Sequence, residues 1–481
     1  MKTWVRVFLA IAFPLGIAAG LAVAVSSAAD VGAIPNEASA AAAVAAQDIP
    51  ATSPRLTPIV AAARSVAPSV VSVTVLRTVR QSSRRSLMEE FFGRIPRQAE
   101  RQVSGLGSGF AINDNGFVVT NEHVVSGADS IVVTDAQGRR LRAELVGADA
   151  LTDIAVLKVE AGRIPPAPLG TSSDLMVGEP AIAIGNPLGY FVANGEATVT
   201  AGVISGVARD IRDSDDNGSL FADMIQTDAA INPGNSGGAL VNAEGRVIGV
   251  NSSILSRSGG SEGLGFAIPI DRALRIADEL RDFGRIRRPW IGVDPEIVAS
   301  DTTLFSSTRV RRVAPGSPAE AAGLETGDVL VEVDGRRIDS PLDLDVGLLD
   351  AGVGATVRVT YERAGREATT TLAVVELPSE QAARIEVLTG LQLVTVNTQI
   401  AIERRLPQEI ESGALIVEIS PENSRFSGLA RDDVIVAINR QRIHTAEEAD
   451  DLFRSFAGGS RIWATVVRDG RLINTQSFYV R

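Results

Sequence analysis

The chain of 481 residues contains no cysteine and only two histidines, His123 and His444. The absence of cysteine excludes disulfide bonds, thiolate nucleophiles and cysteine-ligated metals. Two histidines are too few for a metal centre built from several imidazoles, and we expect neither a metal nor a cofactor. The net charge is −12, which argues against a nucleic acid as partner because phosphate binding needs a basic surface.

The remaining composition is that of a globular, β-rich protein. Hydrophobic residues make up 45% of the chain and charged residues 22%, which is typical of folded domains. The length predicts about three domains of ordinary size. The 45 glycines and 22 prolines suit a fold with many turns.

The N-terminus has the pattern of an export segment. Lys2 and Arg6 frame the start of an apolar run over residues 7–25, and small residues follow at 26–29. Residues 1–29 are therefore predicted to be a cleaved signal sequence or an uncleaved membrane anchor, and both remain open. Either one places the rest of the chain outside the cytoplasm. Residues 30–56 read as a linker.

Short β-branched stretches separated by turn signals follow the linker, with few helices between them. This pattern predicts an all-β sandwich or barrel. One helix is expected, capped by Asp271 and ended by Gly284, with an apolar stripe at helical spacing. We place the first domain at residues 57–285. The predicted strands are residues 70–75, 117–120, 131–134, 154–159, 181–184, 199–205 and 247–250.

The last third of the chain contains an internal repeat with a shift of 105 residues. Gly323-Leu324 recurs as Gly428-Leu429, and Arg363-x-Gly365-Arg366 recurs as Arg468-x-Gly470-Arg471. A period of this length indicates a duplicated domain, here residues 286–378 and 386–481. Each copy is expected to have a capped helix.

The first predicted helix starts after Ser340, with Pro341 in its first turn. The second starts at Thr445, with Glu448 completing a capping box.

The segment with the strongest chemical signal is residues 232–238, Asn-Pro-Gly-Asn-Ser-Gly-Gly. A reactive serine needs exposure, a base, and amide N–H groups aimed at the developing oxyanion. The glycines around Ser236 permit such a backbone path, with Gly234, Asn235 and Ser236 as the oxyanion segment and the Gly234 and Ser236 N–H groups as donors. Taken alone, the segment also fits a glycine-rich turn with an ordinary serine.

The same residues match Gly-x-Ser-x-Gly, the pattern of α/β-hydrolases. That interpretation predicts a helix after the serine and a histidine last in chain order. A strand-like stretch follows instead, and the only later histidine, His444, lies in the duplicated domain. The hydrolase interpretation is therefore disfavoured.

A histidine and an aspartate precede Ser236 in the order used by chymotrypsin-type proteases. His123 follows a predicted strand, and Asp153 directly precedes an apolar run. A carboxylate entering a buried strand needs a partner, which the His123 imidazole would supply. Alternatives are a surface role for His123, or Asp149 or Asp129 in place of Asp153.

With these residues in place, the chain resembles the HtrA/Deg family of serine proteases. The resemblance rests on residues 120–125, 152–159, 183–189 and above all 226–240. It implies a mainly β fold: a chymotrypsin-like double β-barrel followed by two α+β PDZ-like domains. It also implies a homotrimer or larger homo-oligomer in the periplasm, or at the extracytoplasmic face of the inner membrane, that acts on unfolded or misfolded proteins.

The resemblance also suggests how activity is controlled and what is cleaved. Asn235 stands where digestive relatives carry an aspartate that pairs with a freed N-terminus, so we expect switching by loop ordering without proteolytic activation. The candidate loops are residues 189–197, 208–222 and 252–263. At the base of the main pocket the family position is Ala230, with Ile231 and Ile254 nearby, which favours small or aliphatic side chains.

The repeats are expected to bind hydrophobic C-terminal peptides by strand addition. In the first copy, the loop that holds the peptide carboxylate would consist of Trp290, Ile291, Gly292 and Val293, and in the second copy of residues 390–393. The second copy departs from the family at residues 421–426, so a role as a packing or assembly domain remains open for it.

Two weaker signals remain. Residues 213–218 begin like a calcium loop, but Met224 stands where the bidentate glutamate should be, so an acidic loop is favoured and no metal is expected. Residues 77–101 are arginine-rich and contain Phe91-Phe92. The resemblance implies that this loop contacts other subunits.

The sequence therefore predicts a serine endopeptidase that degrades misfolded proteins and captures substrates or activators through PDZ modules. Two alternatives remain: a membrane-anchored sensor protease that cuts one substrate, and a non-catalytic chaperone or adaptor.

Overall fold

The computed structural model describes residues 53–81, 99–187, 196–211, 221–254, 261–298, 307–456 and 459–480. The predicted export segment, most of the linker and the calcium-like stretch lie outside these residues, as do most of the 77–101 loop and parts of the three candidate switching loops. Within the described ranges, no helix is long and apolar enough to cross a membrane.

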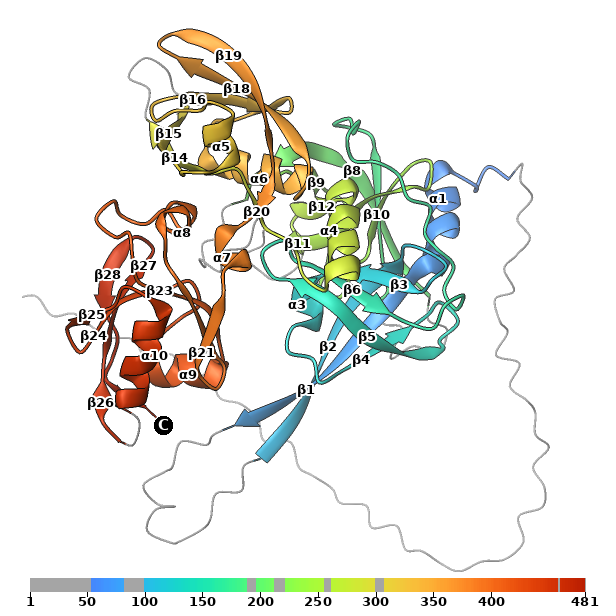
Figure 1. The fold of residues 1–481 in the computed structure, drawn as a ribbon. Coiled ribbons are helices and arrows are strands. Elements are labelled where there is room, and N and C mark those ends of the chain that lie inside the picture. The colour runs from blue at the N-terminus through green and yellow to red at the C-terminus, as the bar shows by residue number, and fades with distance from the viewer. Residues whose placement is uncertain are drawn as a thin grey trace, which may run out of the picture. The chain divides into compact units, whose positions relative to one another are not determined.

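Strands β1 to β12 form two closed β-barrels, as the resemblance predicted (Figure 1). The strand order is β1-β2-β3-β6-β5-β4 in the first barrel and β10-β11-β12-β9-β8-β7 in the second. The first barrel comprises β1 (Val70–Gln81), β2 (Ala99–Ala111), β3 (Phe117–Thr120), β4 (Ser130–Thr134), β5 (Arg140–Asp149) and β6 (Ile154–Lys158). The second comprises β7 (Pro180–Gly185), β8 (Thr198–Arg209), β9 (Met224–Thr227), β10 (Ala239–Asn242), β11 (Val247–Ile254) and β12 (Gly265–Pro269).

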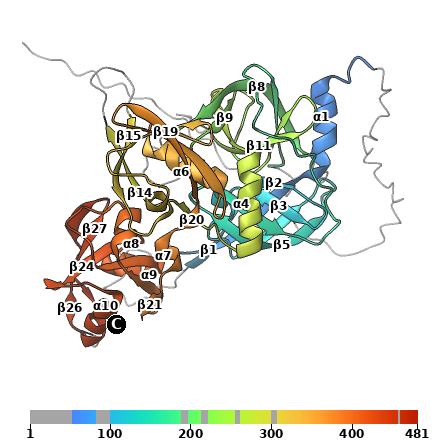
Figure 2. The same ribbon diagram turned by 45° about the horizontal axis from the view of Figure 1, so that its top comes forward.

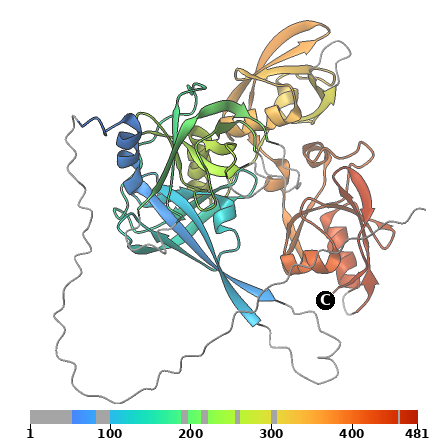
Figure 3. The same cartoon turned by 180° about the vertical axis from the view of Figure 1, so that it is seen from behind.

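Side-chain alternation along the strands builds one core inside each barrel and another between them. On β1, Val71, Val73 and Val75 point into the first barrel, whereas Val70 joins the shared core. That shared core includes Phe110 from the first barrel and Ile184 from the second. Burial of both faces explains why β6 and β7 are nearly continuous apolar runs. Strands β1 and β2 pair along their length and extend together beyond the barrel (Figure 3).

Helices at the two ends of this domain pack on the barrels. α1 (Pro58–Val66) contacts β7 and β10, and α4 (Ile270–Phe283) contacts β5, β6, β11 and β12 (Figure 2). Gly284 ends α4 with φ +70°, as predicted. The predicted cap was wrong: Pro269 is the N-cap residue, and the Asp271 carboxylate accepts hydrogen bonds from the Thr171 hydroxyl and the Ser172 N–H, both at 2.8 Å.

The first repeat is an antiparallel sheet with helices, typical of a PDZ domain. Its sheet runs β14-β15-β16-β18-β19, with β14 at one edge, and β13 pairs separately with β20. The strands are β13 (Pro289–Trp290), β14 (Val293–Val298), β15 (Ser307–Val313), β16 (Val329–Val333), β17 (Arg336–Arg337), β18 (Thr356–Arg363), β19 (Arg366–Ala373) and β20 (Val375–Glu376). The helices are α5 (Pro318–Ala321) and α6 (Pro341–Ala351), and α7 (Pro378–Gln381) leads into the second repeat.

The second repeat has the same plan with one added edge strand. Its sheet runs β21-β22-β23-β24-β27-β28. The strands are β21 (Arg384–Leu388), β22 (Leu391–Thr395), β23 (Ala414–Ile419), β24 (Val434–Ile438), β25 (Gln441–Arg442), β26 (Arg461–Ile462), β27 (Ala464–Arg468), β28 (Arg471–Asn474) and β29 (Phe478–Tyr479). The helices are α8 (Thr398–Glu403), α9 (Pro421–Ser427) and α10 (Ala446–Ser455).

The two copies share an ion pair at the spacing that the sequence repeat predicts. Arg363 pairs with buried Asp328 at 2.6 Å, and Arg468 pairs with buried Asp433 at 2.6 Å. Each arginine also donates to the carbonyl of the repeated glycine, at 2.7 Å and 2.9 Å. The repeated residues therefore anchor the same turn in both copies.

The two predicted helix caps differ in detail. Ser340 forms a full capping box with Asp343. Thr445 accepts from the Glu448 N–H at 3.1 Å, but the Glu448 carboxylate accepts from the His444 N–H at 2.7 Å, one residue before the expected donor.

Candidate active site

The structure brings His123 and Asp153 together at the edge of the first barrel. His123 lies in the short helix α3 (Glu122–Val125), directly after β3, and Asp153 directly precedes β6. The imidazole Nδ1 lies 2.8 Å from Asp153 Oδ1 and 2.9 Å from Oδ2, and the His123 backbone N–H donates to Oδ1 at 3.1 Å. This geometry holds Nδ1–H on the carboxylate and leaves Nε2 to act as a base.

Asp153 is held by several donors besides His123. Its side chain is only 7% exposed, so its charge needs compensation. The Ser252 hydroxyl donates to Oδ2 at 2.8 Å, and the Asn121 amide donates to the Asp153 carbonyl at 2.8 Å. Asp153 adopts φ +54°, an uncommon conformation for a non-glycine residue, which these bonds stabilise.

Asp149, the alternative to Asp153 as partner of His123, makes other contacts. Its carboxylate accepts hydrogen bonds from the Thr152 N–H at 3.0 Å and the Thr152 hydroxyl at 2.6 Å, and it pairs with Arg288. Asp149 thus shapes the turn that presents Asp153. The other rival, Asp129, donates its N–H to the Leu76 carbonyl in a neighbouring turn.

The carboxylate raises the basicity of the His123 imidazole. Burial lowers the pKa of His123, but the hydrogen bond to Asp153 and its charge, with a smaller contribution from Glu122, outweigh this, so the pKa lies above its ordinary value of 6.5. A histidine tuned in this way can accept a proton near neutral pH.

Ser236 lies in a tight turn clamped by the first barrel. Gly234 has φ +98°, and a Cβ on it would lie 2.4 Å from Pro187 Cβ. Gly237 has φ +83°, and a Cβ on it would lie 2.1 Å from the Ser108 carbonyl oxygen. The Ser108 N–H donates to the Ser236 carbonyl at 2.8 Å, and its hydroxyl donates to the Gly234 carbonyl at 2.6 Å. The sequence interpretation missed Ser108, whose only signal was its place in the glycine-rich run 105–109.

The Ser236 hydroxyl points toward Ser252 in this structure. It donates to the Ser252 carbonyl at 2.9 Å, and within the described residues no hydrogen bond joins it to His123. A rotation of the Ser236 side chain is needed to direct its proton toward the imidazole.

Asn235 supports the predicted oxyanion segment without being one of its two predicted N–H donors. The Asn235 N–H donates to the Asn232 carbonyl at 2.9 Å, so it is already used. Asn235 is only 2% exposed and packs against Gly185, where an added Cβ would lie 2.6 Å from its Oδ1. The Gly234 and Ser236 N–H groups remain as candidate donors.

The predicted pocket residues divide into different environments. Ala230 is half-buried, and its carbonyl accepts from the Thr200 hydroxyl at 2.7 Å. Ile231 is 1% exposed and its side chain belongs to the second-barrel core, so its contribution to the substrate pocket stays a prediction. Ile254 ends β11 and pairs with Gly265, while its side chain lies outside the described parts.

The residues after Ser236 exclude the hydrolase alternative. The serine is followed by β10, which pairs with β7 and β11, and not by a helix. Across the described ranges, no group of acidic residues and histidines could hold a metal ion.

The predicted peptide loops occupy corresponding positions in the two PDZ-like repeats, which are called PDZ copies below. Gly292 has φ +98°, and a Cβ there would lie 2.1 Å from Ser317 Cβ. Gly390 has φ +77°, and a Cβ there would lie 2.9 Å from Ser420 Cβ. Since Gly390 is the counterpart of Gly292, the second loop begins two residues earlier than the predicted 390–393. Trp290 is buried and packs with Ala314 and Ile402.

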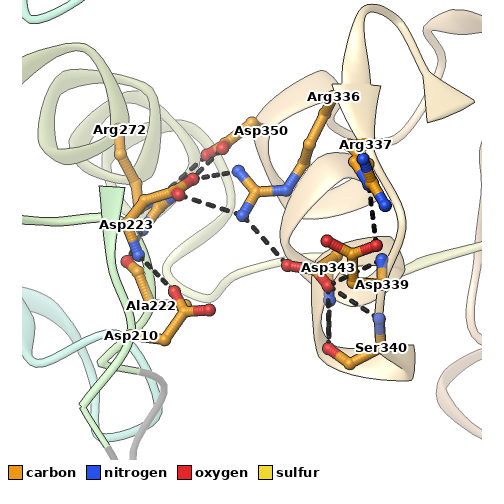
Figure 4. Close-up of polar contacts among 10 residues, drawn as sticks. All are labelled: Asp210, Ala222, Asp223, Arg272, Arg336, Arg337, Asp339, Ser340, Asp343 and Asp350. Atoms are coloured by element: carbon orange, nitrogen blue, oxygen red, sulfur yellow. Dashed lines mark hydrogen bonds and ion pairs between the residues drawn. The ribbon is translucent and has the colours of Figure 1, made fainter. Parts of the chain in front are cut away.

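A charged cluster joins the first PDZ copy to the residue that precedes β9 (Figure 4). Arg336 on β17 makes a two-pronged ion pair with Asp223, with Nη2 at 2.9 Å from Oδ1. Arg272 on α4 bonds Asp350 on α6 through Nε and Nη2, both at 2.8 Å, and reaches Asp223 at 3.1 Å. Asp343 lies 3.5 Å from Arg336.

This cluster borders one of the predicted switching loops, residues 208–222. Arg272 is 5% exposed and also donates to the Ala222 carbonyl at 2.6 Å, while the Asp223 N–H donates to Asp210 at 3.0 Å. Burial by itself raises the pKa of Asp223, but Arg336 and Arg272 outweigh it and lower the pKa below its ordinary value of 3.8. Asp223 is therefore ionised at neutral pH and links both flanks of the loop to the PDZ copy.

Family models match the double barrel and the first repeat. Residues 107–250 match the trypsin-like peptidase domain, and residues 289–374 match the PDZ domain. The chain is 36% identical over 388 residues to a probable periplasmic serine endoprotease, DegP-like, of Hahella chejuensis, with 78% of this chain and 80% of that protein covered. It is 38% identical over 385 residues to the protein of the same description from Halomonas elongata, with 78% of each covered.

Solved structures give the same picture. A variant of the HtrA-type protease AlgW with a decapeptide is 33% identical and superposes with a TM-score of 0.52, covering 67% of this chain and 98% of the other. AlgW with a tripeptide is 34% identical with a TM-score of 0.50, covering 66% and 96%.

Proposed function

Since the chain belongs to the HtrA/DegP family of trypsin-like serine proteases with PDZ domains, we propose that it degrades unfolded or misfolded proteins of the cell envelope in the periplasm. It is a serine endoprotease with PDZ modules. The observation that carries the catalytic assignment is the His123–Asp153 pair at 2.8 Å, which Ser252 links to the half-buried, glycine-flanked Ser236.

The residues divide the reaction as follows. His123 takes the proton of the Ser236 hydroxyl as that oxygen attacks a peptide carbonyl, and later returns it to the leaving amine. Asp153 holds the imidazole tautomer and stabilises its charged form. The Gly234 and Ser236 N–H groups stabilise the oxyanion, and water clears the acyl-enzyme.

Activation would proceed by rearrangement within the folded chain. Asn235 is buried and neutral, so it needs no ammonium partner created by cleavage. The Ser236 hydroxyl must leave the Ser252 carbonyl, 2.9 Å away, and turn to His123. Ordering of the loops around residues 189–197, 208–222 and 252–263 would favour that rotation.

The PDZ copies would couple peptide capture to this switch. The first copy offers the 290–293 loop and the edge of β14 to a hydrophobic C-terminal peptide. The Arg336–Asp223 and Arg272–Asp350 pairs support a path from that copy to residues 208–222. The assembly would be a homotrimer or larger, to be tested by light scattering.

Casein digestion by the chain without residues 1–29, beside its Ser236→Ala variant, tests the proposal. Turnover by the variant should fall about 10⁴-fold or more, while peptide binding persists. Equal turnover would remove Ser236 as the nucleophile. Digestion that requires an added C-terminal peptide would favour a regulatory sensor over a broad degradative protease, and inactivity under all conditions would favour a binding protein.

A further inference from the structure

The two PDZ copies differ at the strand edge that a peptide would use. In the first copy, β14 follows the Gly292 loop and ends its sheet, and within the described residues no strand pairs with its second edge. In the second copy, β22 follows the Gly390 loop and pairs with β23 on one side and β21 on the other. The edge that is open in the first copy is occupied in the second.

The occupying strand runs in the direction that a C-terminal peptide would take. β21 is antiparallel to β22, with Arg384 opposite Val394 and Leu388 opposite Leu391. Its C-terminal end therefore lies at the Gly390 loop, where the last residue of a captured peptide would lie.

Its apolar side chains fill the space between β22 and α10. β21 contacts α10, and Val387 is 7% exposed within the core that contains Ala449 and Phe453 of that helix. Ile385 and Leu388 pack against the same core. The groove between strand and helix is thus filled by apolar side chains of the chain itself.

A carboxylate of β21 already binds the loop. The Gly390 N–H donates to Glu386 Oε1 at 3.1 Å. Backbone N–H groups of this loop are the groups that hold a peptide's terminal carboxylate in strand-addition modules. Glu386 therefore supplies from within the chain the same type of anion that a ligand would bring.

We propose that β21 (Arg384–Leu388) is an internal ligand that closes the peptide groove of the second PDZ copy, so that only the first copy captures peptide until β21 is displaced. The inference rests on the proposed role of the PDZ copies in peptide capture. A strand tethered within the chain competes with free peptide at an effective concentration on the order of millimolar. The apparent affinity of free peptide for the second groove should therefore be at least tenfold lower than for the same groove without β21.

The experiment uses the full chain with Ser236→Ala, to prevent cleavage, and a synthetic peptide of residues 380–388 with a free C-terminal carboxylate. Calorimetric titration should give one peptide per chain. With Val387→Asp, which places a charge in the apolar groove, it should give two. Two equivalent sites in the chain without the Val387 change would overturn the inference and leave the proposed function standing. Absence of binding to every variant would overturn both peptide capture and the inference, but not the protease activity, which casein digestion by the chain with Ser236 tests separately.

Because Val387→Asp could disturb folding, a second test uses a pair of milder variants and amide hydrogen exchange of β21. Glu386→Gln should speed amide hydrogen exchange in residues 384–388 several-fold, because the loop loses its internal anion. Glu418→Gln, an exposed glutamate on β23 of the same sheet, is the matched control and should leave exchange unchanged. Excess peptide should also speed exchange in residues 384–388, and unchanged exchange together with full occupancy of a second site would contradict displacement.

Discussion

The Ser236 hydroxyl donates a hydrogen bond to the Ser252 carbonyl at 2.9 Å, while the hydroxyl of the same Ser252 donates to Asp153 at 2.8 Å. One residue of β11 thus holds both the candidate nucleophile and the carboxylate behind the candidate base. Removing the Ser252 side chain affects only the second bond, because the carbonyl remains.

Ser252→Ala should therefore lower kcat/KM roughly tenfold, since a hydrogen bond to a charged group contributes about 1.5–3 kcal/mol. Asp153 loses a donor, its negative charge is less stabilised, and the pKa of His123 should rise further. The acid limb of the pH profile should shift to higher pH, which a merely structural role of Ser252 would not produce. Ser252→Thr keeps a hydroxyl and should restore both quantities; failure to do so would argue against positioning of Asp153.

The pH dependence of the unaltered protease follows from His123. Its pKa is raised above 6.5, and the base must be neutral, so kcat/KM should fall as pH drops through a value above 6.5. For the same reason the protonated imidazole stabilises the fold below pH 6.5, and this contribution is lost as pH rises through the folded-state pKa. A flat profile of kcat/KM from pH 5 to 8 would contradict the role of His123 as base.

Arg336→Ala should uncouple the first PDZ copy from the loop at residues 208–222. Its guanidinium binds Asp223 through two nitrogens, so its loss should lower the ratio of peptide-stimulated to basal cleavage several-fold. Arg337→Ala is the matched control, because that neighbour is 72% exposed and pairs with Asp339. Equal ratios in the two variants would show that the cluster carries no coupling.

Asp350→Asn should destabilise the chain by about 1–2 kcal/mol, because it removes one of the two carboxylate partners of a buried arginine while Asp350 itself is 39% exposed. Arg272 is 5% exposed and bonds Asp350 through two nitrogens. Asp339→Asn breaks only an exposed pair and should cost less than about 1 kcal/mol. Denaturant unfolding at pH 7 compares the two.

The depressed pKa of Asp223 means that its stabilising contribution is present above pH 3.8 and is lost as pH falls through the folded-state pKa.

Patterns local to a few residues were predictable from the sequence. The strand at Phe117–Thr120 was predicted with the bounds observed, because β-branched runs bounded by turn residues have few alternatives. The repeat at 105 residues reappears as the Arg363–Asp328 and Arg468–Asp433 pairs. Asp271 was mispredicted as a cap because its oxygens bind Thr171 and Ser172, which a one-dimensional pattern cannot relate to it.

The sequence by itself determined the order of His123, Asp153 and Ser236, the glycines at 234 and 237, and the duplication of the C-terminal domain. These depend on residue type and spacing along the chain. Only the tertiary structure decided that Ser252 joins Ser236 and Asp153, that Asn235 uses its N–H on Asn232, and that β21 lies beside β22. The Ser252 contacts join segments far apart in the sequence, so they depend on how the two barrels pack against each other. The other two contacts are local, but the packing around them selects one turn or pairing among the several that the local sequence allows.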